Sequence, residues 1–250
     1  MALHSSGLSG RQWRRLASAL VDRGFRAVVP DLVGHGKSPE WPEREPFSFH
    51  VDVGHAVALL ESLEAPAHVV GHSYGAFVAL LAAREVPSRV RSLALYEPVA
   101  FGVLDRVEDA DAVRELEGVG SPWDGSPGGR ERWLKSFVDY WSGSGAWEAL
   151  REDARAEFRR VAGVVHGAVV ALARDATPAS AYAVVSAPAL LMTGQQSTLA
   201  AHAVVRRLSV ALAGARVLTV PGAGHMGPLT HAEAVNGAIL DWLAAKPPPA

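Results

Sequence analysis

The sequence predicts an α/β fold in which helices flank a mostly parallel β-sheet. Short apolar runs alternate with stretches of helical periodicity along the chain, a pattern typical of strand–helix units around such a sheet. The 250 residues are 49% hydrophobic and 20% charged. This composition supplies enough apolar surface for a sizeable core and excludes an intrinsically disordered chain.

The strands and helices follow from these runs in chain order. Runs with the length of buried strands occupy residues 26–30, 67–70, 90–96, 189–193 and 216–220. Apolar residues recur at helical spacing over 13–21 and 49–60, and an Ala- and Leu-rich stretch over 76–83 ends before Pro87. Each early strand is therefore followed by a helix that can cover the sheet.

The alternation stops at about residue 99 and resumes at about residue 187. Helical stretches at 104–117, 130–147 and 147–174 predict a helical cap, residues 99–186, inserted into a core of residues 1–98 and 187–250. The cap holds four of the seven tryptophans, Trp123, Trp133, Trp141 and Trp147. These side chains either line a cavity between cap and core or pack the helices of the cap.

The absence of cysteine and the net charge of −2 narrow the available chemistry. They exclude disulfides, cysteine-bound metals and thiol nucleophiles, and they give no basis for nucleic-acid binding. No apolar run is long enough to span a bilayer, and the N-terminal residues lack the apolar region of a secretory signal. We therefore expect a cytoplasmic protein without a membrane partner, whose chemistry uses hydroxyl, imidazole and carboxylate groups.

Gly71-His72-Ser73-Tyr74-Gly75 is a G-x-S-x-G motif between a predicted strand and a predicted helix. A serine on such a sharp turn needs small neighbours, because strand and helix approach each other there, and the turn exposes its hydroxyl. The motif predicts that Ser73 is a nucleophile. The alternative is a purely structural turn.

A nucleophilic serine needs a base, and His225 is the best placed of the ten histidines. It ends the loop Pro221-Gly222-Ala223-Gly224-His225, directly after the last predicted strand. His72 is expected to point away from the turn and to pack in the core. The sequence contains no H-E-x-x-H motif, which would indicate a metal site.

Two glycine-rich segments imitate nucleotide-binding motifs. Residues 222–227 spell G-x-G-x-x-G, but Pro228 follows and no further strand completes a βαβ unit. Residues 36–38 match the end of a P-loop, but Asp31 stands where its first glycine would be. We expect no nucleotide cofactor and no metal.

Three features resemble the α/β-hydrolase family: Ser73 on a sharp turn after a strand, His225 near the end of the chain, and the helical insertion 99–186 between them. Apart from the insertion, the resemblance covers nearly the whole chain. Segments 4–7, 31–38 and 221–225 resemble its oxyanion loop, its D-x-x-G-x-G-x-S turn and its histidine loop. The resemblance implies that the backbone amides of Ser6 and Tyr74 form an oxyanion hole, each contributing on the order of 3 kcal/mol. Asp31 is expected to cap its turn.

The acidic partner of the histidine departs from the commonest family pattern. Relatives often carry Gly-x-x-Asp after the strand at 189–193, whereas this chain has Gly194-Gln195-Gln196-Ser197. Other members place the acid after the strand that follows the nucleophile helix, which here gives Glu97. We assign Glu97. The alternatives are a cap carboxylate such as Asp105 or Asp124, or a dyad without an acid.

These residues predict a serine hydrolase that cleaves a carboxylic ester or related acyl bond of a small, apolar or aromatic substrate. The alternatives are a cofactor-free perhydrolase, a C–C bond hydrolase, or a ligand-binding homologue without turnover. The absence of an acid at Ser197 favours the last of these. Only Met1-Ala2-Leu3 precede the oxyanion loop, where the family has two or three strands. We therefore expect a shortened sheet or a start further upstream. The oligomeric state is not predicted.

Overall fold

The computed structural model confirms the α/β fold. It describes residues 1–250 except 43–44, 118, 120–122, 124–125 and 246–250. Five parallel strands form one sheet in the order β1 (Ala2–Leu3), β2 (Ala67–His72), β3 (Val90–Tyr96), β4 (Ala189–Gly194) and β5 (Arg216–Val220). The predicted strands after residue 60 are all confirmed. Their carboxyl ends lie at one edge of the sheet because all pairings are parallel.

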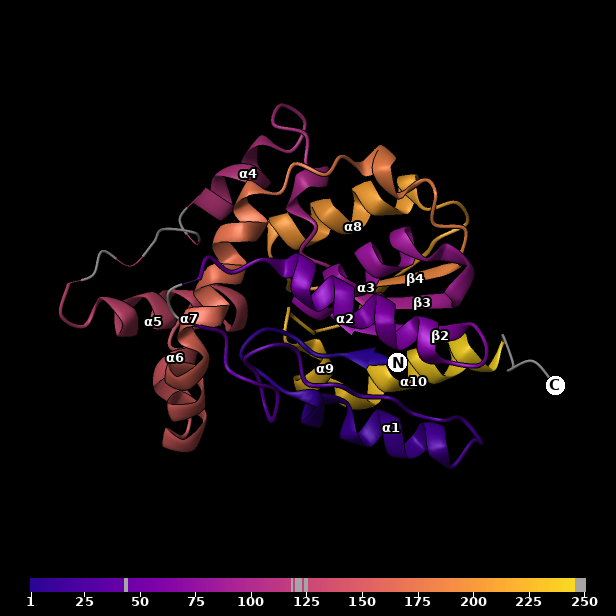
Figure 1. Cartoon of the computed structure of the whole chain (residues 1–250). Coiled ribbons are helices and arrows are strands. Elements are labelled where there is room, and N and C mark those ends of the chain that lie inside the picture. Colours follow the sequence, from indigo (N-terminus) through magenta and orange to yellow (C-terminus); the bar gives the residue numbers. More distant parts are fainter. Residues whose placement is uncertain (43–44, 118, 120–122, 124–125, 246–250) are drawn as a thin grey trace.

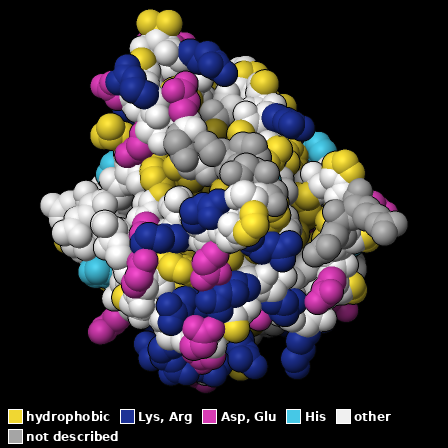
Figure 2. All heavy atoms as spheres, turned by 90° about the vertical axis from the view of Figure 1, so that its left-hand side faces the viewer, with side chains coloured by type: hydrophobic (Ala, Val, Ile, Leu, Met, Phe, Trp, Pro, Cys, Tyr) yellow, Lys and Arg dark blue, Asp and Glu magenta, His cyan; other side chains and the backbone are white. Residues whose placement is uncertain are grey.

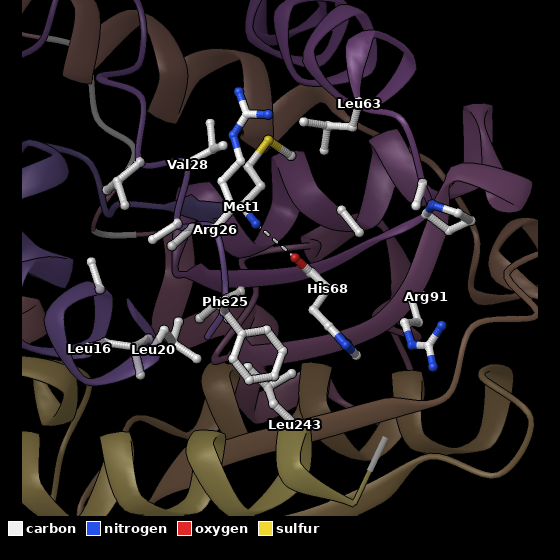
Figure 3. A pocket seen from close by; sticks show the side chains of 18 of the residues that line it. Met1, Leu16, Leu20, Phe25, Arg26, Val28, Leu63, His68, Arg91 and Leu243 are labelled. Atoms are coloured by element: carbon white, nitrogen blue, oxygen red, sulfur yellow. Dashed lines mark hydrogen bonds between the residues drawn. The ribbon is translucent and has the colours of Figure 1, made fainter. Parts of the chain in front are cut away.

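The predicted strand at 26–30 is wrong. Its neighbour would be β1, which offers only two residues, and a single backbone hydrogen bond from Ala2 N to Val28 O, 2.9 Å long, links the two segments. One such bond does not make a ladder. Beside it lies a cavity of about 330 Å³, lined by Leu20 and Phe25 among others, where the Met1 ammonium donates to His68 O at 2.8 Å (Figure 3).

Helices cover both faces of the sheet because neighbouring strand residues point to opposite faces. Leu93 and Leu95 of β3 face one layer, whereas Ala94 and Tyr96 face the other. The first layer contains α2 (Phe49–Ser62), α3 (Tyr74–Glu85) and α8 (Leu199–Ala211), and the second contains α1 (Arg14–Val21) and α10 (Ala232–Ala244). Figure 1 shows α8 and α10 on opposite sides of the sheet. The sheet therefore lies between two helical layers.

The segment between β3 and β4 is helical, as predicted. Its helices are α4 (Ala110–Glu117), α5 (Gly129–Ser142), α6 (Ala146–Ala149) and α7 (Glu152–Arg174). They lie together at one end of the molecule (Figure 1). Helices α5, α6 and α7 share an apolar cluster around Leu134, Val161 and Val165. The predicted helix start at 104 is wrong, because the Asp105 carboxylate accepts the amides of Val107 and Glu108 and holds a turn there.

The outer face of these helices carries both signs of charge. Figure 2 shows Lys and Arg side chains interspersed with Asp and Glu over this end. Arg159 pairs with Glu131 at 2.9 Å, and Arg160 pairs with Glu157 at 2.6 Å. Such exposed pairs are solvated and contribute little to stability.

Across the described ranges, none of the helices has the length and apolar character that crossing a membrane requires.

Candidate active site

Ser73 lies between β2 and α3, in a backbone conformation that side chains rarely adopt. Its φ is 54° and its ψ is −119°. A Cβ on Gly71 would lie 2.7 Å from Ala76 N, and one on Gly75 would lie 2.5 Å from Leu3 O. Both glycines are therefore needed for strand, turn and helix to approach this closely. The turn presents the Ser73 hydroxyl at the carboxyl end of the sheet.

Glu97 and His225 follow two strands, β3 and β5, that lie on the same side of β2 in the sheet. Glu97 directly follows β3, also at positive φ (46°), and its amide donates to Met192 O at 2.9 Å. His225 lies on the loop after β5, which Tyr96 Oη anchors by donating to Gly224 O at 2.7 Å. Parallel strands bring these residues to one edge although 128 positions separate Glu97 from His225.

The structure joins the three predicted residues in one hydrogen-bonded chain. His225 Nε2 lies 2.9 Å from Ser73 Oγ, and His225 Nδ1 lies 2.7 Å from Glu97 Oε2. All three are buried, with exposed fractions of 6% for Ser73, 3% for His225 and 1% for Glu97. An ionised carboxylate only accepts, so Nδ1 carries the histidine proton and Nε2 is free to accept from the serine hydroxyl.

The Glu97 carboxylate is held on its other oxygen by donors from β4 and the loop after it. Thr193 Oγ1 donates to Glu97 Oε1 at 2.9 Å, the Gly194 amide donates at 2.7 Å, and the Ser197 hydroxyl donates as well. Burial alone would raise the pKa of Glu97, but its contacts with His225, together with the Ser197 and Gly194 hydrogen bonds, hold the pKa at about 2. The carboxylate is therefore ionised at neutral pH.

The other candidate acids lie elsewhere. The exposed Asp105 carboxylate holds its own turn in the segment before α4, and Asp124 lies outside the described residues. Asp31 accepts the amides of Gly10 at 2.7 Å and Lys37 at 2.8 Å, which fits the predicted turn-capping role. Ser197, at the position where relatives often carry aspartate, supports Glu97 instead.

His72 and Trp141 both contact His225. The prediction that His72 merely packs in the core is incomplete: it points away from Ser73 but lies 2.8 Å, through Nε2, from the backbone oxygen of His225. From α5, the Trp141 ring lies with its centroid 4.0 Å from that of His225. Sequence position gave no signal for either contact, because the partners are more than 80 residues apart.

A cavity of about 60 Å³ opens at Ser73. Ser6 and Tyr74 line it beside Ser73, and the Tyr74 hydroxyl is engaged by Asp52 at 2.8 Å. Among the described residues, the amides of Ser6 and Tyr74 have no intramolecular acceptor. The remaining lining is apolar: Val99, Phe101, Leu116, Val119, Phe137, Trp141, Val169, Leu172 and Ala173. The cavity therefore suits an uncharged group.

The tryptophans of residues 99–186 divide between the two interpretations. Trp141 lines the cavity, whereas Trp133 and Trp147 are buried in the apolar cluster of α5, α6 and α7, and Trp123 packs against it.

Among the residues that the structure describes, no group of three His, Asp or Glu side chains is arranged to hold a metal ion. The cavity beside β1 contains none of Ser73, Glu97 and His225 in its lining.

The parallel sheet, the serine on its strained turn and the buried histidine beside it define a hydrolase of the α/β class. Comparison with known proteins agrees. The chain belongs to the alpha/beta hydrolase family, whose model matches residues 2–238.

Individual relatives support this membership. The chain is 30% identical to a pimeloyl-(acyl-carrier protein) methyl ester esterase of Chromobacterium violaceum, over 96% of this chain and 92% of the esterase. It is 38% identical to the lipase LipV of Mycobacterium tuberculosis over 117 residues, which span only 46% of this chain and 41% of the lipase. A hydrolase from Pseudomonas aeruginosa superposes with a TM-score of 0.73 at 25% identity, covering 97% of this chain and 88% of that one.

Proposed function

We propose that the protein is a serine esterase that hydrolyses small esters with an apolar acyl group. The observation that carries the proposal is the hydrogen-bonded chain from Ser73 through His225 to Glu97, whose Ser73 end lines an apolar cavity. The full-length similarity to a protein named as a methyl ester esterase supports an ester as the bond that is cleaved.

In this proposal His225 Nε2 takes the proton of Ser73 as Oγ attacks the ester carbonyl carbon. The bond to the alcohol then breaks, and His225 returns the proton to the leaving alcohol. A water molecule attacks the acyl-serine in the second half, giving its proton to His225, and the acid leaves as Ser73 regains a hydrogen. Glu97 stabilises the histidine while it carries two protons, because its own low pKa keeps it ionised.

We assign the oxyanion to the backbone amides of Ser6 and Tyr74. Both residues line the cavity beside Ser73, and Tyr74 is the first residue of α3, where helix N-terminal amides favour a negative charge. Each such donor contributes about 3 kcal/mol to the transition state. Because these amides stabilise the oxyanion by hydrogen bonds, no charged side chain is needed in the cavity.

The helical segment 99–186 acts in this account as a lid on a core of residues 1–98 and 187–250. Phe137 and Trp141 of α5 and Leu172 of α7 form part of the apolar wall above Ser73. A cavity needs about 10–15 Å³ of such volume to hold a single water, so 60 Å³ accommodates only a small group. We therefore assign it to a short acyl chain.

A panel of p-nitrophenyl esters tests the proposal. We expect kcat/KM to rise from acetate to butyrate or hexanoate and to fall by at least about tenfold at dodecanoate, because a long chain exceeds the cavity. Phe137→Ala should move the optimum to longer chains. Phe25→Ala, which enlarges the separate cavity beside β1, should leave the optimum in place.

Three outcomes would count against the proposal. Absence of turnover with every ester favours a binding protein. Activity confined to halide oxidation with hydrogen peroxide in acetate indicates a perhydrolase. A chain-length optimum that is insensitive to Phe137→Ala contradicts the assignment of the cavity to the acyl group.

A further inference from the structure

We propose that Gln12 and His72 form a positioning relay that fixes the proposed base and one proposed oxyanion donor relative to each other; this rests on the function proposed above. Gln12 lies in the 3₁₀ turn Gly10–Trp13 before α1, and His72 ends β2 next to Ser73. Neither side chain lines the cavity. Both therefore act through other residues.

The direction of every hydrogen bond in the relay is determined by the groups at its two ends. The carbonyl oxygen of His225 can only accept, so His72 Nε2, 2.8 Å away, carries a hydrogen and donates it. The Ser5 amide can only donate, and it does so to Gln12 Oε1 at 3.0 Å. The Gln12 amide nitrogen therefore faces His72 Nδ1, at 3.0 Å, and donates to it.

The relay requires His72 to be neutral with its single ring hydrogen on Nε2. Complete burial, together with the nearby His225, lowers the pKa of His72 to about 3, so the ring is neutral throughout the range of an enzyme assay. Gln12 then selects the tautomer, because its amide hydrogen needs the lone pair of Nδ1. A buried neutral histidine with both nitrogens paired in this way has one orientation.

The two ends of the relay are the parts of the site that must stay aligned. His72 Nε2 donates to the backbone oxygen of His225 itself. The two residues before it are held separately: Gly224 O accepts from Tyr96 Oη, and Ala223 O accepts from the Gln196 amide. Ser5 directly precedes Ser6, whose amide is the proposed oxyanion donor. A displacement of about 1 Å between reacting groups can reduce a rate about 100-fold. Loss of the relay should therefore reduce turnover without removing any group that touches the substrate.

Two conservative replacements of His72 separate positioning from packing. The amide nitrogen of glutamine reaches the place of Nε2, so His72→Gln retains the donor to His225 O. Asparagine reaches only the place of Nδ1, so His72→Asn keeps a polar group near Gln12 but loses that donor. With p-nitrophenyl butyrate, we expect kcat per titrated active site to fall about 10- to 100-fold in His72→Asn. We expect the KM of His72→Asn to stay within about twofold, and its activity loss to be largely absent in His72→Gln.

A second pair of variants tests the relay if His72→Asn folds poorly. Gln12→Leu removes the donor to Nδ1 and the acceptor for Ser5, and should lower kcat in the same direction. Added to His72→Gln, it should change kcat less than it does alone, because members of one network do not act additively. Additive effects, or equal kcat values in His72→Asn and His72→Gln, overturn the relay while leaving the esterase proposal intact. A wild-type enzyme that turns over no ester overturns both.

Discussion

Ser73→Ala is expected to lower kcat/KM for p-nitrophenyl butyrate by at least about 10⁴-fold. Ser73 Oγ is the atom that His225 Nε2 contacts at 2.9 Å, and the reaction has no acyl-enzyme without it. The substitution removes one buried oxygen from a serine that is 6% exposed, so the protein should remain folded. Steady-state kinetics with the purified variant measure the loss, and circular dichroism checks the fold.

A distant serine provides the matched control for this prediction. Ser209 lies on α8 and donates to Arg206 O at 2.8 Å, outside the lining of the cavity. Ser209→Ala should therefore hydrolyse the ester at the wild-type rate. If Ser73→Ala retained activity within tenfold of Ser209→Ala, another residue would be the nucleophile.

Glu97→Gln is expected to reduce kcat on the order of 10³- to 10⁴-fold, with little change in KM. Glutamine keeps the shape of the side chain but has no charge to stabilise the doubly protonated His225, and its amide hydrogens face a ring nitrogen that must donate. The carboxylate does not line the cavity, which is why substrate binding should be spared. Initial rates at saturating ester concentration, together with KM, measure both effects.

Asp105→Asn is the control that separates Glu97 from a carboxylate near the lid. Asp105 is exposed, and its carboxylate accepts two amides of the turn before α4. We expect wild-type turnover from this variant. Wild-type turnover in Glu97→Gln, or a large loss in Asp105→Asn, would show that the acid has been assigned to the wrong residue.

The sequence predicted those parts of the fold and site that depend on local pattern. Strands β3 and β5 were predicted at their observed bounds, because both are short runs rich in apolar and β-branched residues. Ser73 and Glu97 each directly follow such a strand, so a correct strand end places the side chain at the correct edge of the sheet. His225 required only the assignment of the loop after the last strand.

The remaining features depend on contacts that no local pattern encodes. Residues 26–30 have the composition of a strand, but strand formation needs a partner, and β1 offers only two residues. His72 and Gln12 are 60 positions apart, and their hydrogen bond appears only when β2 is laid beside the turn before α1. The sequence distinguished Ser197 only as a position without the expected acid, and it gave no indication for Thr193; the roles of both follow from where Glu97 Oε1 lies.

Labelling with a fluorophosphonate, followed by intact-protein mass spectrometry, tests most directly whether Ser73 is the nucleophile. The reagent reacts with a serine that a neighbouring base has activated and leaves other serines unmodified. We expect the wild-type protein to gain one adduct, with peptide mapping to Ser73, and Ser73→Ala to gain none. An unlabelled wild-type protein, or equal labelling of Ser73→Ala, would contradict the serine hydrolase account.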